Sequence, residues 1–470
     1  MPVHSQNKRL IESGIFPIQQ NKTLIQPFSL QITKRSVYVC SMVNENQHIN
    51  SIMRKVLIAV GIMVGMFIIV TSAKAQEKNL FLYGDVETVG GDTYTGFIRW
   101  GDDEVYWVEL LNAKKSSNDF LKYLSKREVE ELSEQGEGNS WLGIDLGVLS
   151  IWEDKYSRTN HRFDTRFGDI ASIEPVSKSK ALIKIKNGVI IEVDNQGGYY
   201  SDIGGGVVIL DNELGEVNLK WNRIELITFK TAPEDAPEPF GRPIYGTVDA
   251  GRKGTFSGLI QWDMDERFLN EVLDGKTRGD DREIPFRSIK AIEKERNGAL
   301  VILNSGREFV LTGSNDVNNE NRGVVVFDPE VGRIQIPWRD FMRAEFTHDS
   351  VTGLSYDDFP VSQGLSGTIK TIEGDEYAGL LVYDLDESWE FEILDGKDDN
   401  VEFDIPFRNV KSIIPRNYNY SMVELKNGTS ILIGDERDVT SDNDGILVFT
   451  SKNSEPIYIK WSKIDEIIFD

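Results

Sequence analysis

The chain has 470 residues, a net charge of −24 and a single cysteine, Cys40. One cysteine excludes a disulfide framework and any zinc or iron–sulfur site with several cysteine ligands. The excess of acidic residues argues against a nucleic-acid-binding protein, because phosphates attract Lys and Arg. A chain of this length predicts about three domains.

Residues 53–75 have the three-part layout of a secretory signal peptide. Arg54 and Lys55 form a short basic region, residues 56–70 form an apolar run, and residues 73–75 offer a small-x-small cleavage site. The run is shorter than the about 20 residues that a spanning helix needs. We therefore expect signal cleavage, no stable membrane span afterwards, and a periplasmic or extracellular protein. The alternative is a signal anchor with the C-terminal part outside the cytoplasm.

Residues 1–52 precede this signal, although a secretory signal ordinarily begins a chain. They lack a clear repeat or a strong hydrophobic periodicity. We interpret them as an upstream extension from a misassigned start, and we leave them and the signal out of the fold prediction.

Three copies of one sequence unit follow. Residues 246–292 and 367–413 match at a constant spacing of 121 residues, and a related segment begins at residue 84. The same position near the end of each copy holds a tryptophan that we expect in the core, namely Trp221, Trp338 and Trp461. The predicted organisation is module 1 (76–229), a Pro-rich linker (230–243), module 2 (244–346), a second linker (347–363) and module 3 (364–470).

Strand signals dominate each module. Asn187-Gly188 and Asn427-Gly428 mark tight hairpins, and short strands recur at a spacing typical of sandwiches or barrels. We predict an all-β chain in which each module has two halves of about five strands. The layout of each half resembles the Sm-like and SH3-like small β-barrels, which implies a barrel fold and assigns no functional residue. The whole repeat is similar to uncharacterised exported bacterial repeat proteins, and that resemblance implies no activity.

Module 1 carries an insertion at about 112–160. Residues 118–135 predict an amphipathic helix, because Leu121, Leu124 and Leu132 fall on one face. Ser117 or Asn118 suits its N-terminal cap. We expect this insertion to provide specificity, since insertions on a repeated scaffold often carry function.

Three tryptophans belong to no repeated position and lie in or near the insertion. Exposed aromatic rings can stack on sugars or anchor a protein partner. The alternative is a small local core. The candidate ligand-binding residues are Trp107, Trp141 and Trp152.

Acidic side chains gather at two places in modules 2 and 3, an acidic turn and a later polar loop. Calcium takes about six to eight oxygen ligands, so these turns and loops are candidate Ca²⁺ sites, and Ca²⁺ is the only cofactor that the sequence suggests. The alternative is a plain turn, because Asp and Asn side chains bond the nearby backbone. The candidate ligands are Asp263, Asp265, Glu266, Asp384, Asp386 and Glu387 in the acidic turns and Asp316, Asn318, Asp438 and Asp442 in the polar loops.

No serine-nucleophile or metalloprotease motif occurs in the chain. We therefore expect a non-enzymatic binding or structural role at the cell envelope or outside the cell. The expected partner is a protein or polysaccharide of the envelope. The alternative is a carboxylate-dependent, glycosidase-like hydrolase of an envelope polymer, since such chemistry needs only two carboxylates.

Overall fold

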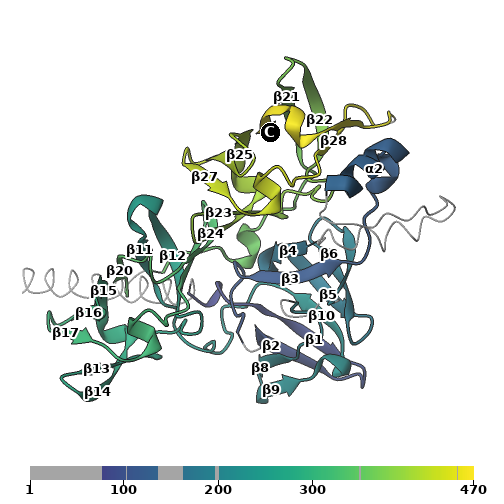
Figure 1. Ribbon diagram of the computed structural model, residues 1–470. Coiled ribbons are helices and arrows are strands. Elements are labelled where there is room, and N and C mark those ends of the chain that lie inside the picture. Colours follow the sequence, from purple (N-terminus) through teal and green to yellow (C-terminus); the bar gives the residue numbers. More distant parts are fainter. Residues whose placement is uncertain (1–76, 102, 136–161, 196–200, 349–350, 453) are drawn as a thin grey trace, which may run out of the picture. The chain divides into compact units, whose positions relative to one another are not determined.

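The computed structural model describes residues 77–101, 103–135, 162–195, 201–348, 351–452 and 454–470 (Figure 1). Within these ranges the protein is all-β, which confirms the predicted class. The longest helix there is α2 (Lys126–Gln135), and the 3₁₀ turns are short. The upstream extension, the signal, Trp141 and Trp152 lie outside the described residues. None of the described helices is long and apolar enough to cross a membrane.

Within the described residues, each of the three predicted modules contains ten strands of three to eight residues. Those of module 1 are β1 (Tyr83–Thr88), β2 (Thr93–Trp100), β3 (Leu110–Lys115), β4 (Arg162–Arg166), β5 (Ile170–Pro175), β6 (Lys180–Ile185), β7 (Ile190–Asp194), β8 (Val207–Asp211), β9 (Gly215–Leu219) and β10 (Ile224–Phe229). Those of module 2 are β11 (Tyr245–Asp249), β12 (Thr255–Trp262), β13 (Val272–Thr277), β14 (Asp280–Pro285), β15 (Ile289–Glu295), β16 (Gly298–Leu303), β17 (Glu308–Leu311), β18 (Val324–Asp328), β19 (Gly332–Ile336) and β20 (Arg343–Phe346). Those of module 3 are β21 (Ser366–Thr371), β22 (Glu376–Val382), β23 (Ile393–Asp398), β24 (Val401–Pro406), β25 (Val410–Pro415), β26 (Tyr420–Leu425), β27 (Ser430–Gly434), β28 (Ile446–Phe449), β29 (Ile457–Ile459) and β30 (Ile464–Phe469).

The first, second and fifth to tenth strands pair in the same order in each module, and all pairs are antiparallel. Module 1 runs β9-β8-β2-β1-β10-β5-β6-β7-β3-β4, and module 3 runs β29-β28-β22-β21-β30-β25-β26-β27-β23-β24. Module 2 runs β19-β18-β12-β11-β20-β15-β16-β17, with β13 and β14 as a separate hairpin. Figure 1 shows β1, β2, β8 and β9 lying side by side.

These are large open sheets, which corrects the expectation of closed barrels. The last strand of each module pairs with the first, as β10 does with β1, and β8 pairs with β2. Strands from the two sequence halves therefore interleave in one sheet. Neither half closes on itself, because its hydrogen-bonding edges are used by strands of the other half.

Aromatic rings form the same edge-to-face pair in each module core. The ring centroids of Trp262 and Trp338 lie 6.1 Å apart at 82°, and Tyr383 and Trp461 repeat this geometry at 6.1 Å and 84°. Trp100 and Trp221 lie 6.0 Å apart at 75°. Such pairs add to the burial of apolar area. The structure thus places the repeated tryptophans in the core, as expected.

The insertion begins its helix later than the sequence predicts. A 3₁₀ turn (Leu121–Tyr123) comes first, and Leu124 is extended. The helix α2 then starts after Ser125, whose N–H donates to Glu128 Oε2 at 2.7 Å while its Oγ accepts the Glu128 N–H at 3.3 Å. This reciprocal cap satisfies two orphan donors and favours a fresh helix start. Asn118 caps only the preceding turn, through the N–H of Phe120.

The apolar face of the insertion packs on module 3. Leu121, Leu124 and Leu132 surround a small buried cluster of β22, the turn after it and β28. The ring of Tyr123 lies 5.2 Å from that of Phe449, edge to face. The insertion therefore holds two modules of the chain together.

A glycine in the second strand of each module permits close contact of three strands. Gly258 pairs with Gly246 on β11, and a Cβ on Gly258 would collide with the carbonyl oxygen of Phe327. We expect Gly258→Ala to lower the free energy of unfolding by about 1–3 kcal/mol, because the packed strands cannot part without strain. Urea denaturation measures this change. Gly205→Ala is the matched control, since its nearest neighbour lies 3.7 Å away, and an equal loss in both variants would contradict the steric explanation.

Candidate functional site

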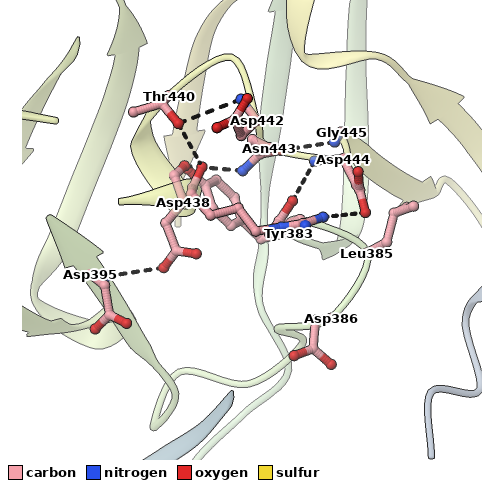
Figure 2. Close-up of polar contacts among 12 residues, drawn as sticks. Tyr383, Leu385, Asp386, Asp395, Asp438, Thr440, Asp442, Asn443, Asp444 and Gly445 are labelled. Carbon is pink, nitrogen blue, oxygen red and sulfur yellow. Dashed lines mark hydrogen bonds and ion pairs between the residues drawn. The ribbon is translucent and has the colours of Figure 1, made fainter. Parts of the chain in front are cut away.

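The structure brings each acidic turn against the polar loop of the same module. We call the two together the acidic loop pair, residues 263–266 with 315–323 in module 2 and residues 384–387 with 437–445 in module 3. Figure 2 shows the pair of module 3, where the hydroxyl of Tyr383 donates to the carbonyl oxygen of Asp438 at 2.6 Å. The sequence treats these segments as separate candidates, and the fold joins them.

The same indole or phenol contact occurs in all three modules. Trp262 Nε1 donates to the carbonyl oxygen of Asp316 at 3.0 Å, and Trp100 Nε1 donates to that of Asp202 at 3.1 Å. The carboxylates of these loop residues accept a backbone N–H from the third strand. For Asp438 the donor is the N–H of Asp395, at 2.9 Å. These carboxylates therefore fasten the loop to the sheet.

Arginine side chains of the polar loops neutralise the first carboxylate of each acidic turn. Asp384 accepts from Arg437 Nε at 2.6 Å and also from a backbone N–H of its polar loop. Asp263 is fully buried and accepts the backbone N–H of Arg322 at 2.5 Å. Asp265 lies 2.5 Å from Arg322 Nη2.

The remaining candidates also bond within their own loops or across modules. Asn318 Oδ1 accepts the Glu320 N–H at 2.6 Å, and the Asp442 N–H donates to Thr440 Oγ1 at 3.4 Å (Figure 2). Asp386 lies 3.1 Å from Lys115 Nζ. Across the described ranges, no three His, Cys, Asp or Glu side chains are arranged to hold a metal ion. Arginines and backbone donors bind oxygens of Asp263, Asp265 and Asp384, and the calcium site stays a prediction.

The last acid of each turn lacks such a donor and its pKa is raised. Burial, then the neighbouring Asp265, raises the pKa of Glu266 to about 9. Burial, then Asp202, raises the pKa of Glu104 to about 8. The pKa of Glu387 lies well above its usual value, chiefly through burial. These carboxyl groups favour their protonated form near neutral pH.

A second repeated glutamate, which the sequence analysis missed, links the modules. Glu392 Oε2 accepts the backbone N–H groups of Ser388 and Trp389, at 2.6 and 2.9 Å, and its other oxygen lies 2.5 Å from Lys115 of module 1. Glu109 caps its own turn in the same way and lies 2.9 Å from Arg267 of module 2. The sequence could have indicated this residue, because a glutamate occupies the same position in every copy of the repeat.

Trp107 lies in the core of module 1, where only 1% of its surface is exposed. Its ring packs edge to face on Phe229, with centroids 5.7 Å apart, and 4.6 Å from the ring of Tyr356 in the second linker. The ring is therefore covered by protein and offers no face to a sugar. Trp107 thus belongs to the main core of module 1 and not to a small separate core beside the insertion.

Grooves lie at the same place in modules 1 and 2, beside the repeated tryptophan. The groove of module 1 has a volume of about 670 Å³, and that of module 2 about 320 Å³. Both are formed by the turn between the fifth and sixth strands and the loop before the eighth strand. The first is lined by Lys178, Gly204, Asn218, Lys220 and Trp221, among others, and the second by Arg296, Asn318, Glu320 and Trp338, among others.

No protein-family model, no curated protein and no solved structure matches this chain.

Removing the buried cation at the contact of modules 1 and 3 should destabilise the protein strongly. Lys115→Ala leaves Asp386 and Glu392 buried without their counter-charge, and we expect a loss of about 3–5 kcal/mol in the free energy of unfolding. Urea denaturation gives the value. The control Lys180→Ala removes an exposed pair with Glu192 and should leave the urea midpoint close to that of wild type. Equal midpoints for both variants would contradict the role assigned to Lys115.

The raised pKa of Glu266 predicts a specific pH dependence. Below the ordinary pKa, near 4.5, both folded and unfolded states hold the proton; between about 4.5 and 9 the unfolded state releases it first, so stability falls as pH rises. We expect Glu266→Gln to melt at a higher temperature than wild type at pH 8, with the difference shrinking toward pH 5. Glu213→Gln, on an exposed loop, should shift neither curve. A constant difference across pH would refute this assignment.

Proposed function

We propose that this chain is an exported, non-enzymatic protein of three tandem β-repeats that binds a protein or polysaccharide of the cell envelope. The strand order that the modules share, apart from the separate hairpin β13–β14 of module 2, supports the repeat. The signal-like residues 53–75 support export. The resemblance of each half-repeat to Sm-like and SH3-like barrels concerns only the order of its strands and turns.

The recurring groove is the observation that supports binding. It occurs beside Trp221 and again beside Trp338. The lining in module 1 mixes Val207 and Leu219 with lysines and asparagines, and the lining in module 2 is polar apart from Trp338 and glycines. Concave sites with a few convergent polar groups are typical of binding sites. A groove repeated along one chain suits a scaffold that contacts an extended partner.

The acidic loop pairs support the non-enzymatic half of the proposal. A glycosidase needs two carboxyl groups that face a sugar across open space. In modules 2 and 3 the first acid of each turn binds an arginine, and Asp316 and Asp438 bind backbone N–H groups. These bonds explain the acids as fasteners of the loops.

Isolated peptidoglycan sacculi provide the test against the hydrolase alternative. The purified chain should release no reducing ends from sacculi in overnight incubation. Release that disappears in Glu104→Gln, Glu266→Gln or Glu387→Gln would overturn the proposal and identify the catalytic acid. Sedimentation with the same sacculi distinguishes the partner: binding weakened at least twofold by Lys220→Glu and unchanged by Lys184→Glu assigns a polysaccharide to the groove of module 1.

A further inference from the structure

The ninth strand of each module lies at the edge of its sheet, and the three copies of this edge differ. In module 2, β19 pairs with β18 on one side and with β24 of module 3 on the other. That second pairing aligns Arg333 with Asp404 and Ile334 with Phe403. Among the described residues, β9 of module 1 pairs with β8 alone. In module 2, the ninth strand thus pairs with a strand from a different module.

The edge of module 3 is closed to such pairing. Register with β28 places Pro456 where module 2 has Arg333, and proline has no N–H to donate. Tyr458 of β29 also packs on the small buried cluster of module 3 that the insertion covers. Prolines and covering segments are the usual means by which proteins protect sheet edges. Within the described part of the chain, β9 has neither protection.

The backbone of β9 keeps the space that an added strand requires. In module 2 a Cβ on Gly332 would collide with the carbonyl oxygen of Asp404, so only glycine admits β24 there. Gly215 stands at the same position of β9, and a Cβ there would meet nothing within 4 Å. The corresponding residue of module 3 is Glu455. Module 1 therefore retains the open edge that module 2 fills.

Charge identifies the partner. Across β19 and β24, Arg333 Nη1 lies 2.7 Å from Asp404. In β9 the residue at the position of Arg333 is Glu216, which is exposed and accepts a long 3.5 Å hydrogen bond from Asn218. Opposite charges on paired strands stabilise the pair, and like charges destabilise it. A strand that adds to β9 in the same register should therefore carry Lys or Arg opposite Glu216.

The strand of a second copy that corresponds to β24 in module 2 does not meet that requirement. The hairpin strand β14 of module 2 corresponds to β24, and it has Glu283 at the position of Asp404. Its pairing with β9 would place two carboxylates, Glu283 and Glu216, opposite each other. The net charge of −24 also disfavours contact between copies and attracts a basic segment.

We propose that β9 binds an extended segment of a partner protein by strand addition, with Lys or Arg of that segment opposite Glu216. The proposal rests on the binding role proposed above and names the class of partner. The module 1 groove continues this edge, since it is lined by Asn218, Leu219 and Lys220. It offers a place for the side chains that follow the added strand.

Two peptides based on β24 test the proposal. Both span residues 399–407 and carry a fluorescent label; one keeps Asp404 and the other has Asp404→Lys. Fluorescence anisotropy with the purified full chain should show at least about threefold tighter binding of the lysine peptide. Glu216→Arg in the chain should reverse this order. The same preference in wild type and in Glu216→Arg would overturn the proposal.

Controls separate the strand edge from general charge. Glu213→Arg makes the same charge change outside the strand and should keep the wild-type order. Glu216→Pro places at β9 the residue that module 3 has there, and it should abolish binding of both peptides. Self-association of wild type that Glu216→Pro removes would assign the edge to a second copy and refute the proposal. If neither peptide binds while the chain still binds sacculi, only this inference is refuted. If the chain releases reducing ends from sacculi, only the proposed function is refuted.

Discussion

A buried glutamate that serves two modules at once is the interaction on which the rest of the structure depends. In Glu109 and in Glu392, one carboxylate oxygen accepts two backbone N–H groups of the same turn, and the other oxygen binds a cationic side chain of a different module. A carboxylate removed from water is costly unless all its lone pairs are satisfied. The turn and the contact between modules therefore form together, because each completes the solvation of the same side chain.

The excess of acid in this chain has a structural explanation in the same terms. Asp263, Asp316, Asp384 and Asp438 act as acceptors that close loops, and arginines of those loops or backbone N–H groups neutralise them. Where no donor is near, as for Glu266, the group keeps its proton instead. Both outcomes avoid an unpaired buried charge.

The all-β class, the repeat spacing and the core tryptophans followed from the sequence because they depend on local signals, namely alternation, Asn-Gly turns and repeated apolar positions. The closed-barrel prediction was wrong, since pairing of β10 with β1 and of β8 with β2 joins strands far apart in sequence, and local patterns do not record that choice. The acidic candidates were chosen by residue type. Whether a carboxylate meets a metal or an arginine depends on a loop about 50 residues away, as with Asp384 and Arg437.

Repetition makes the differences between the modules informative. The equivalent edges of the three modules differ. The edge of β19 pairs with β24, and the edge of β29 is preceded by Pro456. The edge of β9 contains Glu216 and has no second partner among the described strands. An unprotected sheet edge favours aggregation unless another strand pairs with it. Glu216 stands in β9 where β19 has Arg333, and it would repel Glu283 of the hairpin strand β14. The backbone N–H and C=O groups at this edge of β9 still have no second strand among the described residues. An unpaired sheet edge with Glu216 at this position is suited to a basic strand from another protein.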